Sequence, residues 1–398
     1  MGKALEGIRV LDLTQYEAGC ACTQMLAWLG AEVLKIEPPA GEPGRATLSD
    51  RPDMDGYYFL LLNANKKSVT LDLKRERGRA LFEAMVPRAD VVVENFGPGT
   101  MDRLGLGYDA LRRINLRIVF ASIKGFGSKG PYAEYKSFEW ISQAMGGSMS
   151  LTGEPDGTPM RVTAGLGDSG SGLHCAIGIL AAIVQRQATG VGQYVEVAQQ
   201  DSVINLVRVN FRDHYPQDRP VPRRGNRVYN TAPCNLYRCA PGGPNDYIYI
   251  HAASIEMWRA LMRIVGRPEY GEDPRFITRQ KRWPYVEEID QIIEAWTVTR
   301  TKGEAMEILA GAGVPCGAVL DTGELLANPH LLERGMMVPV DYPQRGHFTM
   351  PGNPVHLSDS PTEVTPAPLL GEHTAEVLAA LLGQTPADLE ALRADRVI

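Results

Sequence analysis

The first half of the chain alternates between short apolar runs and helical patterns, and this alternation restricts the fold more than any other feature. Residues 8–13 predict a buried strand, 18–29 a helix rich in small residues, and 32–37 a second strand. The alternation continues with strands at 68–73, 90–96, 118–123 and 193–197, and helices at 75–85, 108–115, 169–187 and 201–209. Strands separated by helices form parallel sheets, so we predict an α/β fold with a Rossmann-like sheet.

The loop after the first predicted strand argues against one common use of such a sheet. Residues 14–20 contain a single glycine, Gly19, where the GxGxxG dinucleotide fingerprint needs three. A nicotinamide-dependent dehydrogenase is therefore disfavoured.

A change of composition near residue 212 marks the end of this region. Residues 212–246 are dense in Pro, Arg, Gly and Asn and predict an extended linker or loop. Beyond it we predict a smaller α+β unit, with a strand at 247–251 and helices at 255–265, 286–296 and 302–311. A polar amphipathic helix is expected near 386–393.

Charge and cysteine usage limit the classes of partner. The 398 residues carry a formal net charge of −6, whereas general nucleic-acid binding needs a concentrated basic surface. The chain has no run of 18 apolar residues and no basic-then-apolar leader, so we expect no membrane contact and a cytoplasmic location. Its six cysteines form no CxxC pair, which predicts reduced thiols and no metal site.

Asp168 is the most informative single residue. It lies between glycines, in the run 164–172, where the long helix predicted over 169–187 begins. That helix is apolar on nearly every side and is therefore expected to be buried in the core, fixing whatever stands at its start. An aspartate at this place commonly caps its helix, but one flanked by glycines can also present its carboxylate to a ligand. From this segment alone, both interpretations stay open.

Blocks along almost the whole chain resemble the family III CoA-transferases, also called the CaiB/BaiF family. This family includes formyl-CoA:oxalate transferase, which the motifs resemble most, and has the α-methylacyl-CoA racemases as relatives. The matching blocks lie at 5–12, 29–37, 63–68, 93–99, 165–169, 189–193, 313–317 and 368–374.

The resemblance implies how the chain is divided and assembled. A large Rossmann-like, CoA-binding domain is expected to begin with residues 1–211 and to be completed by a return segment over 321–398. The linker and the small α+β domain, 212–320, are inserted between them. In this family two such subunits interlock like linked rings, so the resemblance also implies an intertwined homodimer.

The resemblance further implies that Asp168 is a covalent nucleophile. A carboxylate attacks the acyl-CoA to give a mixed anhydride, and the released CoA thiolate converts this anhydride into an aspartyl-CoA thioester. The incoming acid then reverses the exchange, which divides one difficult displacement into easier steps. Gly167, Gly170 and Gly172 are expected to give access, and the helix N-terminus to favour the anionic carboxylate.

The family's CoA-contacting positions can be carried over to this sequence. Here CoA is a substrate, and no tightly bound cofactor is implied. Lys74, Arg103 and Lys136 suit phosphates, Asn95 suits hydrogen bonding, and Leu71 and Phe96 suit the flanks of adenine. The full expected set is Gln15, Tyr16, Glu17, Ala18, Leu71, Asp72, Leu73, Lys74, Asn95, Phe96, Gly97, Arg103, Lys136, Ser137, Phe138 and Glu139.

Three departures from the formyl-CoA transferase pattern bear on the acceptor acid. Glu17 replaces a glutamine, and its carboxylate would repel an anionic acid unless protonated, or would act in proton transfer. Thr47 and Phe138 replace aromatic residues of the oxalate pocket, although Tyr58 is retained. Residues 225–234 replace a glycine-rich lid. Succinate or mesaconate therefore remain possible acceptors beside oxalate.

The racemase alternative needs a second acid–base group beside the aspartate. Racemases of the superfamily use the histidine of a Gly-His-Asp motif, which aligns here with Ser137-Phe138-Glu139. Phenylalanine cannot transfer a proton, so an epimerase would need another base, Glu139 or Glu17. A non-catalytic CoA-binding subunit is the third alternative, against which the intact Asp168 segment speaks.

Overall fold

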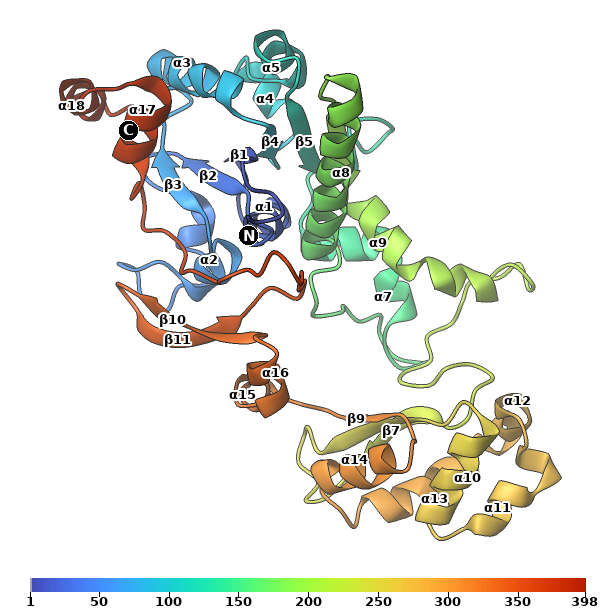
Figure 1. The fold of residues 1–398 in the computed structure, drawn as a ribbon. Helices are drawn as coiled ribbons and strands as arrows, with labels where there is room; N and C mark the ends of the chain where they lie inside the picture. Colours follow the sequence, from blue (N-terminus) through green and yellow to red (C-terminus); the bar gives the residue numbers. More distant parts are fainter. Residues whose placement is uncertain (1) are drawn as a thin grey trace. The chain divides into compact units, whose positions relative to one another are not determined.

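The structure is a computed structural model that describes residues 2–398 (Figure 1). It divides into two compact units. The first consists of residues up to Met149, Arg161–Arg219 and Pro329–Ile398, and the second of Ser150–Met160 and Pro220–Asn328. The first unit thus combines three stretches of the chain and the second combines two.

The first unit is built on a six-stranded sheet in the order β3-β2-β1-β4-β5-β6. Every neighbouring pair is parallel, as the alternation of strands and helices predicts. The strands are β1 (Arg9–Asp12), β2 (Glu32–Glu37), β3 (Lys67–Thr70), β4 (Val91–Glu94), β5 (Val119–Lys124) and β6 (Tyr194–Ala198). The predicted Rossmann-like α/β class is therefore confirmed.

Alternate side chains of the strands supply two hydrophobic cores, one on each face of the sheet. On one face Val10, Val33 and Val91 pack against α1 (Ala18–Trp28) and α8 (Asp168–Thr189). On the other face Leu11, Leu34 and Val92 share a core with five other helices. These are α3 (Glu76–Met85), α4 (Thr100–Arg103), α5 (Tyr108–Ile114), α17 (Thr374–Leu382) and α18 (Pro386–Ala394).

The C-terminal segment lies against the edge of this sheet. Figure 1 shows α17 and α18 beside α3 and β3. The backbone N–H of Thr70 donates to the Thr374 hydroxyl at 2.9 Å, which ties α17 to β3. The other elements of the unit are α2 (Tyr57–Leu62), α6 (Glu139–Met145), α9 (Gln199–Val207), α16 (Pro329–Glu333) and the hairpin β10 (Met337–Tyr342) with β11 (Gly346–Pro351). Helix α7 (Ser148–Leu151) is divided between the two units.

The second unit has an antiparallel sheet in the order β7-β8-β9 and its own core around Trp258, Phe276 and Ile293. Its strands are β7 (Cys234–Arg238), β8 (Tyr247–His251) and β9 (Cys316–Ala318). Its helices are α10 (Ile255–Ile264), α11 (Pro268–Glu272), α12 (Arg279–Arg282), α13 (Val286–Thr297), α14 (Lys302–Gly311) and α15 (Thr322–Leu326). Within residues 2–398, no helix combines the length and apolar character needed to cross a membrane.

Two expectations about secondary structure and burial are wrong. The segment predicted as a loop over 212–246 contains β7, which pairs with β8 despite the surrounding Pro and Gly. The helix predicted to be buried on all sides, α8, is half covered: Leu173, Ile177 and Val184 are 47%, 65% and 66% exposed in the single chain. Its apolar pattern does not distinguish a face that packs on the chain's own sheet from a face that the chain itself leaves uncovered.

Candidate active site

The strand order opens a crevice between the carboxyl ends of β1 and β4. The chain continues from β1 toward β2 on one side and from β4 toward β5 on the other, which is the usual ligand site of an open parallel sheet. Asn95, after β4, holds the loop after β1: its Oδ1 accepts the N–H of Gln15 and its Nδ2 donates to the Gln15 carbonyl, both at 2.8 Å.

A cavity of about 370 Å³, here called the Asp168 pocket, occupies this crevice. Its lining comes from the segments that follow β1, β4, β5 and β6 and from the start of α8. Eleven of the residues expected from the sequence meet there: Gln15, Tyr16, Glu17, Ala18, Asn95, Phe96, Gly97, Lys136, Ser137, Phe138 and Asp168.

Asp168 is the first residue of α8, and its side chain does not cap the helix. The capping group is Glu139, the first residue of α6. Its Oε2 accepts the N–H of Asp168 at 2.5 Å and its Oε1 the N–H of Gly167 at 3.2 Å. The capping interpretation of Asp168 is therefore wrong, and its carboxylate is available to the pocket.

Glu139 is buried and held from its own helix. Gln143 Nε2 donates to Glu139 Oε1 at 2.6 Å and also to the carbonyl of Val162 at 2.8 Å. Gly167 allows the start of α8 to lie close to α6, because a Cβ at position 167 would collide with the Ser142 hydroxyl. The sequence therefore requires glycine at 167 so that α6 and α8 can meet.

Gly172 has a packing role as well. A Cβ at this position would lie 2.5 Å from the carbonyl oxygen of Ala18, so glycine allows α8 to approach α1 closely. Gly172 was expected to give access to the substrate, and the structure shows that it allows two helices to pack closely.

The carboxylate of Asp168 sits in an acidic, partly buried environment. Burial, together with the nearby charges of Glu17 and Glu139, raises its pKa to about 7, although a hydrogen bond from Gln199 acts in the opposite direction. The net pKa differs from the low value that the helix N-terminus alone would favour. The carboxylate titrates near neutral pH instead.

Glu17 and Tyr58 lie close to this charge. Glu17 Oε1 accepts a hydrogen bond from the Ser169 hydroxyl at 2.7 Å, which fixes its position beside the start of α8. The pKa of Tyr58 is raised by burial and by the charges of Glu17 and Asp168, so this phenol stays protonated.

The remaining expected residues do not line the Asp168 pocket. Thr47 donates to the carbonyl of Pro43, and Leu71 is buried in the core beneath the sheet edge. Asp72 Oδ1 accepts the N–H of Lys74, while Arg103 donates to the carbonyl of Pro98 and to Thr100. Tyr58, Leu73 and Glu139 are also outside the lining, although the charge of Asp168 raises the Tyr58 pKa and Glu139 bonds the Asp168 backbone.

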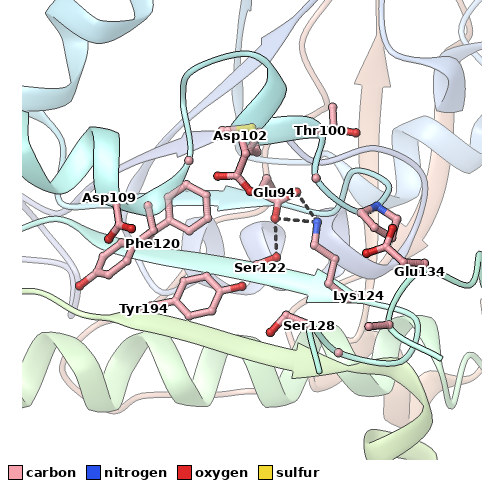
Figure 2. A pocket seen from close by; sticks show the side chains of 17 residues that line it. Glu94, Thr100, Asp102, Asp109, Phe120, Ser122, Lys124, Ser128, Glu134 and Tyr194 are labelled. Carbon is pink, nitrogen blue, oxygen red and sulfur yellow. Dashed lines mark hydrogen bonds and ion pairs between the residues drawn. The ribbon is translucent and has the colours of Figure 1, made fainter. Parts of the chain in front are cut away.

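A second cavity of about 370 Å³ adjoins the first and shares Pro98 and Lys124 with it (Figure 2). Figure 2 shows Glu94 bonded to both Ser122 and Lys124, near the rings of Phe120 and Tyr194. The described residues that line it include one lysine, already paired with Glu94 at 2.9 Å, and four acids: Glu94, Asp102, Asp109 and Glu134. Its charge therefore disfavours phosphate groups. Throughout residues 2–398, no cluster of three or more His, Cys, Asp or Glu is arranged to hold a metal ion.

Comparison with known proteins decides the family. The sequence model described as CoA-transferase family III matches residues 5–374. The chain belongs to CoA-transferase family III. The predicted membership, and with it the predicted acyl-CoA:carboxylate CoA-transferase class, is confirmed.

Relatives of this CoA-transferase are similar over all or nearly all of their length. A formyl-CoA:oxalate CoA-transferase of Streptomyces avermitilis is 48% identical, with 100% of both chains covered. One of Bradyrhizobium sp. is 43% identical over 96% of this chain and 94% of the relative. The crystal structure of a CaiB/BaiF family protein from Brucella suis has a TM-score of 0.85 and 31% identity, and covers 96% of this chain and 100% of that protein.

Six residues that line the pocket of this family III CoA-transferase were missed by the sequence interpretation: Pro98, Ile123, Lys124, Gly125, Tyr135 and Gln199. Lys124 ends β5, and Gln199 directly follows β6 as the first residue of α9. Both stand at the carboxyl edge of a predicted parallel strand, where ligands bind in such sheets. For Gln199 this signal was hidden because the helix was expected to begin at residue 201.

Proposed function

We propose that the chain transfers CoA from formyl-CoA to oxalate through a covalent intermediate on Asp168. The observation that carries the proposal is the placement of Asp168: its carboxylate faces the switch-point pocket while Glu139 takes over the capping of its helix. The names of full-length relatives at 42–48% identity support the choice of donor and acceptor.

The reaction uses the two oxygens and Cγ of Asp168 in turn. Oδ2 attacks the formyl carbon, CoA thiolate leaves, and a mixed anhydride forms. The thiolate then attacks Cγ and expels formate, which leaves an aspartyl-CoA thioester. An oxalate oxygen attacks Cγ and releases the thiolate, which finally attacks the oxalyl carbon to give oxalyl-CoA and the free carboxylate. No proton, metal or redox partner enters this balance.

CoA is proposed to enter along the carboxyl edge of the sheet. The loop Asn95–Gly97 and Lys136 lie in the Asp168 pocket, and Lys74 is exposed after β3 at the same sheet edge. Exposed lysine and arginine side chains there, including Arg103, suit the phosphates of CoA. In this proposal CoA is a substrate and no resident cofactor is needed.

The acceptor subsite is proposed to lie between Glu17, Phe138 and Tyr58. Thr47 is proposed to stand near its outer wall. Phe138 is 65% exposed and meets the Tyr16 ring edge-on at 6.4 Å. Because Glu17 adds negative charge, the acceptor binds best when a neighbouring cation or proton compensates it. Succinate and mesaconate are the competing acids.

Product analysis tests the proposal. The enzyme is incubated with formyl-CoA and oxalate, succinate or mesaconate, and the acyl-CoA products are separated by mass. Oxalyl-CoA is expected as the main product, and hydroxylamine is expected to trap a hydroxamate at Asp168. A preference for succinate or mesaconate would overturn the acceptor assignment, and full turnover by Asp168→Ala would overturn the nucleophile.

We further propose an intertwined homodimer. The domain expected over 1–211 and 321–398 corresponds in it to the first unit and the inserted 212–320 to the second, with the boundaries that the structure gives. The exposed apolar stripe of α8, formed by Leu173, Ile177 and Val184, supports a second copy as its cover. A cytoplasmic location belongs to the same proposal and is supported by six free cysteine thiols.

A further inference from the structure

Gln199 is the only residue in the described chain that donates a hydrogen bond to the carboxylate of Asp168. Its Nε2 donates to Oδ1, and no donor to Oδ2 is found within residues 2–398. The two oxygens of the carboxylate are therefore distinguished before any substrate binds. One is held by the protein and the other is open to the pocket.

The fold fixes Gln199 firmly. It is the first residue of α9, directly after β6, and only 6% of it is exposed. β6 is paired with β5 through Lys124 and Ala198, so the residue that follows is anchored to the central sheet. A side chain held in this way needs no reorganisation when charge develops beside it.

We propose that Gln199 is a catalytic residue that holds Oδ1 of Asp168 and stabilises the negative charge formed there whenever Cγ is attacked. The inference rests on the proposed nucleophilic role of Asp168. It goes beyond that role because it assigns a hydrogen-bond donor to the oxyanion that forms on Oδ1 when Cγ of Asp168 is attacked.

The electron balance of the proposed reaction creates this charge twice. When the CoA thiolate attacks Cγ of the mixed anhydride, the π electrons of the Cγ–Oδ1 bond move to Oδ1. The tetrahedral intermediate collapses when these electrons reform the double bond and formate leaves with the Oδ2–Cγ electron pair. The attack of the acceptor acid on the thioester repeats the same shift, with CoA thiolate as the leaving group.

A neutral amide suits this position better than a charged group. Glu17 and Glu139 already surround Asp168 with negative charge, so an oxyanion on Oδ1 needs a donor. A lysine or arginine would form an ion pair with the resting carboxylate and make it a weaker nucleophile. An amide N–H bonds the carboxylate modestly and bonds the more concentrated oxyanion charge more strongly.

The test compares Gln199→Met, which keeps the side-chain length without a donor, with Gln199→Ala. Gln200→Met is the matched control, because Gln200 stands next on the same helix and its side chain donates to the carbonyl of Met145. We expect kcat to fall about 100-fold in both Gln199 variants, as for loss of one oxyanion donor, while KM for formyl-CoA changes less than about twofold. In rapid-quench experiments, both formation and decay of the Asp168 thioester are expected to slow.

A pH profile separates this role from a purely structural one. Because the Gln199 hydrogen bond lowers the pKa of Asp168, its removal is expected to move the acid limb of activity to higher pH. Circular dichroism checks that each variant is folded. If Gln199→Ala does not fold, Gln199→Met still tests the proposal.

The outcomes distinguish this inference from the proposed function. If the unmodified enzyme forms no adduct at Asp168, the proposed function fails. If it forms the adduct and Gln199→Met forms and consumes it at the same rate, the Gln199 inference alone is overturned. An increase in KM without a loss of kcat would also overturn it, because it would assign Gln199 to substrate binding.

Discussion

Glu139 caps the helix that Asp168 begins. Its Oε2 lies 2.5 Å from the backbone nitrogen of Asp168 and its Oε1 lies 3.2 Å from that of Gly167. The first N–H groups of a helix need an acceptor, and an aspartate at this place would otherwise supply it from its own side chain. Glu139 therefore leaves the Asp168 carboxylate free for chemistry.

The first prediction removes this cap. Glu139→Ala is expected to lower the free energy of unfolding by about 1–2 kcal/mol, as for loss of an N-cap. It is also expected to reduce kcat strongly, because the Asp168 side chain can then turn back to its own helix N–H. Urea unfolding and steady-state rates measure the two effects. Glu134→Ala is the control, since Glu134 is exposed and lies in the second cavity; equal effects of both changes would contradict the capping role.

The second prediction concerns pH. In the proposed mechanism only the ionised carboxylate attacks, so the transfer rate is expected to increase with pH up to the Asp168 pKa of about 7 and to level off above it. Glu17→Gln keeps an acceptor for the Ser169 hydroxyl but removes a charge that raises this pKa. The acid limb of the rate profile is expected to move down by about one pH unit in this variant.

The same substitution is expected to increase kcat/KM for oxalate several-fold, because it removes a repelling charge. Glu134→Gln provides the control for a general change of protein charge. An acid limb that stays in place in Glu17→Gln would show that Glu17 does not act on Asp168.

The third prediction is that Asp168→Asn stabilises the chain at alkaline pH. The raised pKa means that folded Asp168 keeps a proton which the unfolded chain loses at about pH 4. From about pH 4 to 7 unfolding releases this proton, so stability falls as pH rises, and above about 7 the penalty stays constant. We expect the free energy of unfolding of Asp168→Asn to exceed that of the unmodified chain by about 1–3 kcal/mol at about pH 8. At about pH 4 the two free energies are expected to differ little. Equal gains at both pH values would contradict the raised pKa.

The sheet and much of the site were predictable because every strand carries Val, Ile or Leu and helical patterns separate the strands, and because ligands bind where such parallel strands end. Gln15–Ala18 after β1 and Asn95–Gly97 after β4 follow from this rule and from the family motifs. Glu139 acting on Asp168 from 29 positions away does not, because capping between separate helices depends on tertiary packing. Gln199 was missed because β6 passes directly into α9 without a turn signal.

The burial of α8 shows a different limit. Its apolar residues surround the helix in the sequence, yet the sheet and α1 cover only one side of it. An apolar pattern records that a face avoids water and does not record which chain covers it.

The fourth prediction compares two adjacent lysines. Lys66 is buried, and its Nζ bonds Asp12 Oδ2 at 3.1 Å, Thr23 at 2.7 Å and Asn63 at 2.8 Å beneath the start of α1. Lys66→Met leaves the buried Asp12 carboxylate without this partner, so we expect a loss of about 3–5 kcal/mol in the free energy of unfolding. Lys67 is one-third exposed and pairs with Glu376 at the surface, and Lys67→Met is expected to cost at most about 1 kcal/mol. Urea denaturation decides between them, and equal losses would contradict the buried network.

The fifth prediction concerns the exposed face of α8, where Leu173, Ile177, Ala181, Val184 and Ala188 recur at spacings of three and four. This spacing makes one continuous apolar stripe, which an isolated monomer rarely leaves in water. Analytical ultracentrifugation is therefore expected to give twice the mass of one chain.

Ile177→Glu and Val184→Glu are expected to yield monomers or aggregates, because each places a charge in the buried centre of the proposed contact. Leu116→Glu is the matched control, since Leu116 is 62% exposed and belongs to the segment before β5 and not to α8. It is expected to leave the mass unchanged. A monomeric wild-type chain, or dimers that persist in both α8 variants, would exclude this face as the contact between two copies.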